Sequence, residues 1–105
     1  MKVIYVRENR MVRVYRHRDK KNSSTVCDFN DEWLHDNITC RPCHYCGKTD
    51  LMGADRIDNK KGHTKDNIVP CCKQCNLIKN QYFNCQEFKL LVDYCRKNGI
   101  ASKYF

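Results

Sequence analysis

Two pairs of cysteines have the spacing of a metal site. Cys43 and Cys46 form one Cys-x-x-Cys pair, and Cys72 and Cys75 form a second pair further along the chain. Each pair can bend its backbone around one edge of an ion, so four thiolates in this arrangement can close a tetrahedral Zn²⁺ site. Such a site contributes on the order of 10 kcal/mol to folding. The spacing therefore predicts a structural zinc site.

The choice of ligands is open by one pair or one residue, because Cys40 lies three positions before Cys43 and Cys71 adjoins Cys72. The remaining cysteines have the character of small core residues; they are Cys27, Cys85 and Cys95. Nine cysteines is an odd number, and no signal-length apolar run opens the chain, so a secreted disulfide framework is disfavoured. We expect a reducing compartment, the cytoplasm or the nucleoid or nucleus with DNA.

The polar segment between the two cysteine pairs predicts a second, catalytic site. Residues 53–70 alternate around Ile57, turn through 59–62 and resume as a strand at Ile68, which is typical of a hairpin. A helix after Cys75 would hold Asn76 against this hairpin and near Asp55. A carboxylate and an amide oxygen are hard ligands that suit Mg²⁺, which also accepts water and phosphate oxygens. The pair therefore favours phosphate chemistry.

Four motifs in this order resemble the HNH endonucleases of phages, mobile elements and some restriction systems. They are Cys-x-Tyr-Cys-Gly, Ala-Asp-Arg-Ile-Asp-Asn, Gly-His-Thr-x-Asp-Asn-Ile-Val-Pro and Cys-x-x-Cys-Asn-x-x-Lys, over residues 43–79 and more loosely 29–95. The resemblance implies a ββα-metal fold that hydrolyses DNA phosphodiester bonds. It also implies Asp55 and Asn76 as ligands of a catalytic Mg²⁺ or Mn²⁺, and Asn67 as the residue that fixes the hairpin loop. Lys79 is implied to face DNA, with an ordinary solvated lysine as the alternative.

Arg56 departs from the pattern, because most of the family has a histidine base at this position. A guanidinium does not give up its proton in proteins, but it can clamp a phosphate or neutralise developing charge. His63 is our first candidate for the base, against the alternative of a turn residue that binds phosphate or backbone; His17 is a weaker second candidate. Asp58 is expected to orient Arg56, with a strand-end cap as the alternative.

Positive charge is concentrated at the start of the chain. Residues 1–26 hold eight lysines and arginines against two acids, within a net charge of +8. A basic segment of this kind gains affinity for a phosphate backbone through counterion release, although a solvated surface is the simpler interpretation. We expect contacts to DNA from Arg7, Arg10, Arg13, Arg16, Arg18, Lys20 and Lys21.

Local patterns predict the elements that position these residues. The β-branched and aromatic runs at 3–6 and 11–15 favour a β-hairpin, and 16–24 a basic loop. Capping residues and acids favour a short helix at 30–37 that buries Trp33 and Leu34. A second helix should begin after Asn84 and stop at Gly99.

These expectations combine into one α+β fold. It has a small ββα-metal (HNH) core with a four-cysteine zinc site, an N-terminal hairpin and flanking helices; residues 1–26 are the basic hairpin and loop, and 27–105 the nuclease domain of one compact unit. The predicted function is a metal-dependent DNA endonuclease, and RNA stays open as a substrate. Double-strand cleavage would need a homodimer. The rivals are a catalytically degenerate, zinc-bound DNA-binding module and a structural zinc ribbon that binds proteins. No apolar run is long enough for a membrane span.

Overall fold

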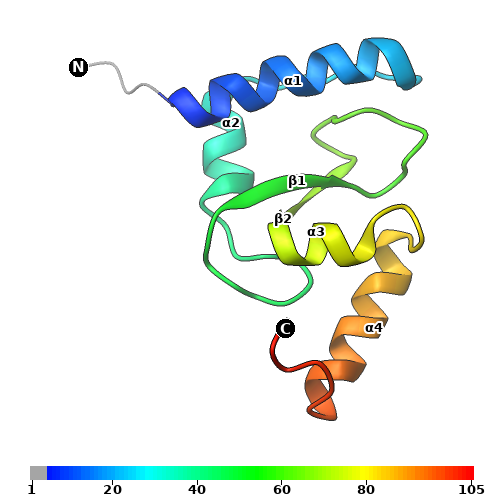
Figure 1. Cartoon of the computed structure of the whole chain (residues 1–105). Helices are drawn as coiled ribbons and strands as arrows, with labels where there is room; N and C mark the ends of the chain where they lie inside the picture. Colours follow the sequence, from blue (N-terminus) through cyan, green and yellow to red (C-terminus); the bar gives the residue numbers. More distant parts are fainter. Residues whose placement is uncertain (1–4) are drawn as a thin grey trace.

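The computed structural model describes residues 5–105 and contains five helical elements and two strands. In order they are α1 (Val6–Asn22), α2 (Asp31–Leu34), the π-helical turn η1 (His35–Thr39), β1 (Met52–Arg56), β2 (Ile68–Cys72), α3 (Lys73–Lys79) and α4 (Cys85–Lys97) (Figure 1). The predicted α+β class is confirmed. None of the helices in this part of the chain is apolar and long enough to cross a membrane.

A ββα unit lies at the centre of the molecule. β1 and β2 pair antiparallel, in a register that runs from Met52 opposite Cys72 to Arg56 opposite Ile68. α3 follows β2 without a linker, because Cys72 ends the strand and also caps the helix: its sulfur accepts a hydrogen bond from the backbone N–H of Cys75. The hairpin and helix predicted between and after the cysteine pairs are both present.

The N-terminal hairpin prediction is wrong for the described residues. Residues 6–22 form one helix, α1, and therefore also replace most of the basic loop predicted at 16–24; residues 3 and 4 of the predicted first strand lie outside the described range. Glu8, Val12 and Asp19 are the buried residues of α1, and their spacing places them on one helical face. No glycine or proline interrupts residues 5–22, so tertiary burial of this face prevails over the β propensity of the valines.

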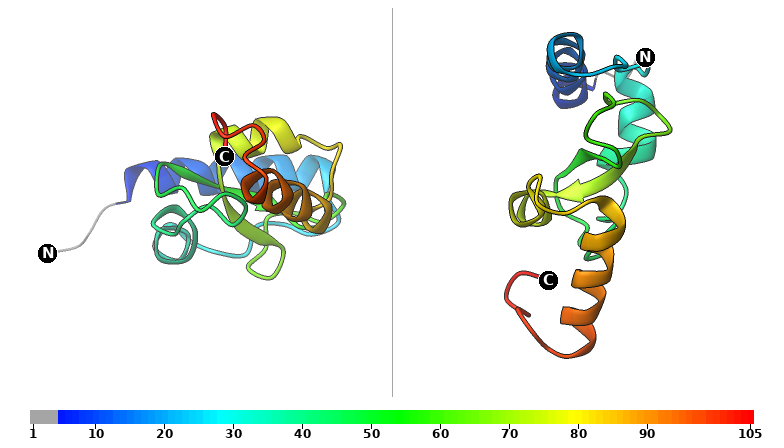
Figure 2. Two further views of the ribbon diagram at one scale, coloured as in Figure 1. Left: turned by 90° about the horizontal axis from the view of Figure 1, so that it is seen from below. Right: turned by 90° about the vertical axis from the view of Figure 1, so that its right-hand side faces the viewer.

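Two hydrophobic cores lie on either side of the hairpin. The cysteine core gathers the four paired cysteines with Tyr45, Met52, Phe88 and Val92, and so joins β1 to α4. The α1 core gathers Val12, Cys27, Phe29, Leu34, Ile38 and Ile68, and so joins α1 to α2 and β2. Seen from the side, α1 and α4 lie towards opposite ends of the molecule, with the sheet between them (Figure 2).

The helices α2 and α4 begin at the positions that their capping residues predict. Asn30 accepts a hydrogen bond from the backbone of Trp33 at the start of α2, and Leu34 is fully buried, whereas Trp33 is half-buried. At α4 the side chain of Asn84 caps Glu87 while the side chain of Glu87 accepts from the backbone of Asn84, which is a complete capping box. α4 ends before Gly99, whose φ of 66° lies in the left-handed region.

Candidate metal centre and active site

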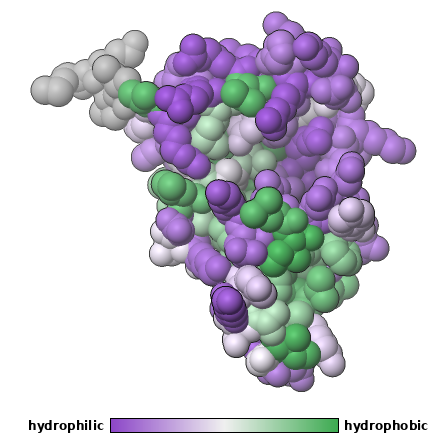
Figure 3. Space-filling view, viewed as in Figure 1, coloured by the Kyte–Doolittle hydropathy of each residue, from purple (hydrophilic) through white to green (hydrophobic). Residues whose placement is uncertain are grey.

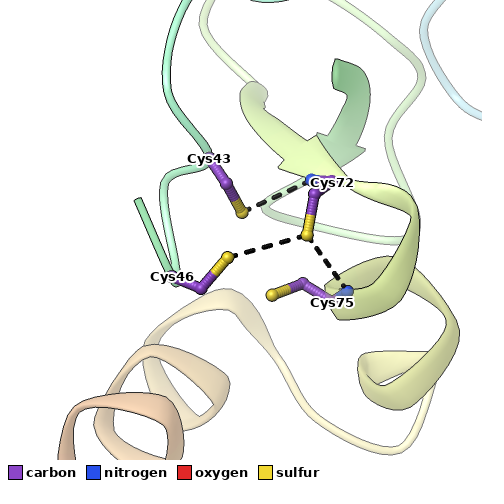
Figure 4. A group of neighbouring side chains, drawn as sticks. All are labelled: Cys43, Cys46, Cys72 and Cys75. Atoms are coloured by element: carbon purple, nitrogen blue, oxygen red, sulfur yellow. Dashed lines mark hydrogen bonds between the residues drawn. The ribbon is translucent and has the colours of Figure 1, made fainter. Parts of the chain in front are cut away.

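Four buried sulfurs meet where the first cysteine loop approaches the start of α3. The ligand atoms of Cys43, Cys46, Cys72 and Cys75 all lie within 4.8 Å of one another, and all four side chains point to one centre (Figure 4). The prediction that these two pairs meet is confirmed. Cys40 is exposed and lies outside the cluster, while Cys71 is buried beside it and donates to the carbonyl of Cys72. Four thiols at this separation suit a tetrahedral Zn²⁺ ion.

The electrostatics of the cluster favour a bound cation. Hydrogen bonds from the thiols of Cys71 and Cys75 lower the pKa of Cys43, and the bond to Cys43 together with burial raises the pKa of Cys75. The thiolate form of Cys43 is thus stabilised, whereas the neutral thiol form of Cys75 is favoured. Several negatively charged sulfurs repel one another in a buried site that contains no positive charge. A Zn²⁺ ion at the centre would supply that charge and hold all four as thiolates.

A cleft of about 880 Å³ runs between α1 and α3 above the hairpin. Asp55 and Arg56 line it from β1, His63 from the loop between the strands, and Asn76 from α3. Tyr15 and Arg18 of α1 line it on the opposite side. The fold therefore brings four of the five predicted active-site residues, which are far apart in sequence, to one concave surface.

Asp55 is held by two donors that are buried and do not line the cleft. Its Oδ1 lies 3.2 Å from the Nζ of Lys79, and its Oδ2 accepts a hydrogen bond from the hydroxyl of Tyr45. Burial and the Asp55 carboxylate raise the pKa of Tyr45, so its hydroxyl stays protonated and donates. A carboxylate offers about four lone pairs, so these two contacts leave Asp55 with lone pairs for a further ligand. Asn76, which lines the same cleft, is exposed.

Lys79 does not face outwards as expected. Its side chain is fully buried and pairs with Asp55, so the ion pair offsets part of the cost of removing the ammonium group from water. The expectation that Lys79 contacts DNA is therefore corrected. The lysine instead orients the carboxylate on which the predicted metal site depends.

His63 is buried against α1. Its Nδ1 lies 2.8 Å from Oδ1 of Asp19, and its ring stacks on Tyr15 with centroids 4.0 Å apart. Burial lowers the pKa of His63 below its ordinary value of 6.5; the hydrogen bond and charge of Asp19 oppose this shift, and Arg56 and Arg18 reinforce it. The ring is consequently neutral at physiological pH, which is the state that can accept a proton.

Arg56 reaches across the cleft from the end of β1. Its Nη1 donates to the hydroxyl of Ser23 and the carbonyl of Lys61, each at 3.3 Å. Both bonds use one nitrogen of a group with five N–H donors, so Arg56 keeps donors for a phosphate. Asp58 does not orient Arg56: its carboxylate accepts from the backbone of Lys60 and so caps the turn after the strand. The alternative interpretation of Asp58 is the correct one.

Asn67 ties the two ends of the hairpin loop together. Its Oδ1 accepts from the backbone of Asp58, and its Nδ2 donates to the carbonyls of Asp58 and Gly62. All of its side-chain hydrogen-bonding groups are thus used inside the loop, and the residue is buried. This network sets where the loop presents His63.

The basic residues of α1 divide into two groups. Arg7 and Arg16 donate to the backbone carbonyls of Met52 and Phe29 and so attach α1 to the rest of the protein. All seven residues are exposed, and the five that do not make such a contact are Arg10, Arg13, Arg18, Lys20 and Lys21. Hydrophilic side chains cover most of the surface over α1, whereas hydrophobic ones gather over α3 and α4 (Figure 3). His17 lies on the outer face of α1 with Arg10 and Arg13, away from the cleft.

Sequence reasoning missed three residues that hold this site together: Tyr15, Asp19 and Tyr45. A signal for the first two exists in hindsight, because Glu8, Val12, Tyr15 and Asp19 follow the spacing of one helical face. Tyr45 stood within a recognised motif but carried no assigned role. Its contact with Asp55 follows only from the folded structure.

A comparison with solved structures identifies the architecture. The rare-cutting HNH restriction endonuclease PacI, described for its mechanism of DNA perturbation, superposes with a TM-score of 0.64 over 90% of this chain and 82% of that chain, at 20% sequence identity. The chain is similar in fold to this HNH endonuclease. At this level of identity the similarity concerns the fold alone.

Comparisons of the sequence add less. No protein-family model matches the chain. The uncharacterized protein R423 of Acanthamoeba polyphaga mimivirus is 35% identical over 46 residues, which are 40% of this chain and 9% of that protein. The chain thus spans less than a tenth of the length of this curated relative.

Proposed function

We propose that this protein is a metal-dependent endonuclease that hydrolyses phosphodiester bonds in DNA. The observation that carries the proposal is the cleft: Asp55, Arg56, His63 and Asn76 line one concave surface within an HNH endonuclease fold. A carboxylate, an amide, a cation and a neutral imidazole are the groups that phosphodiester hydrolysis requires. A module that only binds DNA has no need to bury an aspartate in its cleft.

Asp55 and Asn76 are the residues that would hold a divalent metal ion. Mg²⁺ or Mn²⁺ bound there would neutralise charge on the scissile phosphate and stabilise the leaving oxygen. Lys79 and Tyr45 restrain the Asp55 carboxylate from its buried side. The exposed amide of Asn76 lies on the first turns of α3, whose start is fixed by the cysteine cluster. The zinc site thus has a structural role in positioning one ligand.

His63 is the general base of the proposed reaction. Its imidazole takes a proton from water as the water oxygen forms its bond to phosphorus; the bond from phosphorus to the leaving oxygen breaks, and that oxygen gains a proton from solvent. Arg56 contacts the phosphate and offsets the charge that develops on its oxygens, which requires no change in the protonation of the guanidinium.

The exposed basic face of α1 is the proposed surface for the DNA backbone. α1 forms one wall of the cleft through Tyr15 and Arg18, and its outer residues extend the positive surface beyond the cleft. Phosphate contacts of this kind are independent of sequence and hold the substrate over the active site. The N-terminal part of the chain therefore contributes binding as well as one side of the catalytic cleft.

The first experiment is incubation of the zinc-loaded protein with supercoiled plasmid and Mg²⁺ or Mn²⁺. We expect nicking that requires the divalent ion, and a loss of at least about a hundredfold in Asp55→Asn, which removes the negative charge of one metal ligand, and in Asn76→Ala, which removes the other ligand. Asn at position 55 keeps an acceptor for Lys79, so the buried ammonium retains a partner. Gln74→Ala is the matched control, because Gln74 is on α3 but does not line the cleft.

DNA binding without cleavage under every metal and substrate sequence would overturn the nuclease proposal. That result would favour the zinc-bound DNA-binding module, which Arg56 at the usual base position makes the strongest rival. The ratio of nicked to linear plasmid would also report whether one or two strands are cut.

A further inference from the structure

Asp19 is a buried acid on the most basic helix of the protein. It is fully inaccessible to solvent, although it is flanked in sequence by Arg18 and Lys20, which are both exposed. Its carboxylate accepts hydrogen bonds from the backbone N–H groups of Cys27 and His63, both at Oδ2, and lies 2.8 Å from His63 Nδ1 at Oδ1. A buried charge that makes three directed bonds, two of them to a single residue, is a specific arrangement.

The acceptor character of Asp19 decides which nitrogen of His63 carries the proton. A carboxylate has no proton to donate, so it can only accept a hydrogen bond from the imidazole, and Nδ1 is the donor. The proton of neutral His63 is then on Nδ1, and Nε2 has its lone pair available. Among the described residues, every fully buried side-chain nitrogen or oxygen has a hydrogen-bond partner. Nε2 of His63 makes no hydrogen bond, so it is not fully buried. Because His63 lines the cleft, Nε2 is exposed there.

Two neighbours hold this geometry. Tyr15 stacks on the imidazole with an angle of 13° between the ring planes, which limits rotation of the ring. Gly62 permits the close approach of the loop to α1: a Cβ at this position would collide with the carbonyl oxygen of Thr25 and lie 2.7 Å from the Asp19 carboxylate. The loop that carries His63 can therefore reach Asp19 only because the preceding residue has no side chain.

We propose that Asp19 is a positioning residue that fixes His63 in the Nδ1–H tautomer and aims its unprotonated Nε2 into the cleft. This inference rests on the proposed function in one respect, the use of Nε2 as the base. When Nε2 takes the proton of the attacking water, Nδ1 keeps its own proton, and the resulting imidazolium is paired with the Asp19 carboxylate.

Asp19→Asn is the variant that separates this role from simple support of the loop. The two backbone donors at Oδ2 require an acceptor, so the amide oxygen of Asn takes that place and its NH₂ group faces Nδ1. The imidazole must then accept at Nδ1 and carry its proton on Nε2. We expect a fall in kcat on the order of 10³-fold or more with little change in KM, by analogy with the same substitution in serine protease triads.

The tautomer is read directly from the ¹⁵N chemical shifts of the imidazole in NMR spectra, independently of any cleavage assay. We expect Nδ1–H in the native protein and Nε2–H in Asp19→Asn. Glu8→Gln is the matched control, because Glu8 is also a buried acid of α1 but bonds Thr39 rather than the active site. Its substitution should leave the tautomer unchanged.

An Nε2–H tautomer in the native protein would overturn the proposal, even if the Asn variant failed to fold. So would a folded Asp19→Asn protein with the native tautomer and native kcat. If the native protein does not cleave DNA under any condition, the proposed function fails, while the tautomer measurement still decides whether Asp19 positions His63.

Discussion

The two cores of this chain are held to the central hairpin by different chemistry. On one side, four cysteines join the first loop to α3 and bring α4 into the cysteine core. On the other side, no metal ligand set occurs among the described residues. Hydrogen bonds join α1 to the hairpin loop through Asp19, to β1 through Arg7 and to the segment before α2 through Arg16. Both sides contribute to the cleft. A small polar chain can thus build an active site from one metal-dependent half and one hydrogen-bonded half.

The difference has a consequence for stability. Structural zinc contributes about 10–16 kcal/mol, which is comparable with the whole stability of a typical domain. A set of buried hydrogen bonds to one carboxylate contributes a few kcal/mol, because each bond to a charged group is worth about 1.5–3 kcal/mol. The halves should therefore differ strongly in their response to perturbation.

Removal of zinc is expected to have the largest effect. Chelation, or substitution of Cys75 by Ser, should abolish cooperative unfolding and the hydrogen-exchange protection of both strands, because Cys72 belongs to β2 and to the ligand set at once. Cys40→Ser is the control, since Cys40 is exposed and outside the cluster. Retention of a cooperative melting transition without zinc would contradict the structural role of the site.

Gly62→Ala tests the other half. The added Cβ meets a backbone carbonyl that cannot move cheaply, so we expect a loss of about 1–3 kcal/mol in unfolding free energy with zinc content unchanged. Gly53→Ala is the matched control, because the nearest atoms to a Cβ there are at ordinary contact distances of 3.8 and 3.9 Å. Denaturant unfolding with zinc quantification measures both quantities. Equal stability of the two alanine variants would show that the α1 half tolerates displacement of the loop.

The same contrast explains what could be predicted from the sequence. The cysteine cluster, the ββα unit and the Asn84 cap follow from local spacing, in which residues within a few positions determine the geometry. The contact between Asp19 and His63 spans 44 positions and has no local signature. α1 was mispredicted for a related reason: its buried face is defined by contacts with distant residues, which outweighed the β propensity of its valines.

Lys79 illustrates the same limit within the active site. Its position four residues after Cys75 was correctly placed on the helix, but its side chain points inwards because Asp55 offers a buried counter-charge. Spacing predicts which residues share one face of a helix or strand. Whether that face is buried can be predicted only when the group that packs against it is known. The ligands of a metal site are predictable because the ion itself is the partner.

The pH dependence of cleavage tests whether the α1 half controls the base. Burial holds the pKa of His63 below 6.5, so the neutral ring dominates above that value and the rate should be level there. As pH falls through the lowered pKa, the ring gains a proton and the rate should decline about tenfold per unit. Cleavage rates at saturating DNA measure the profile, with binding followed in parallel. A decline that begins well above pH 6.5 would assign the titration to another group.

The variant His63→Ala tests the same base directly. It should lose the cleavage activity while retaining DNA binding.

The smallest expected effect concerns the basic face of α1 and compares the two ends of the molecule. Arg10→Gln with Arg13→Gln removes two exposed charges from α1, so the slope of log K against log salt concentration should decrease by up to about 2. Arg96→Gln with Lys97→Gln removes two charges from the last turn of α4, at the other end of the molecule, and should leave the slope unchanged. Fluorescence anisotropy with a short duplex at several salt concentrations measures both. Equal slopes for the two double variants would mean that net charge alone attracts DNA, and that α1 contributes no defined phosphate contacts.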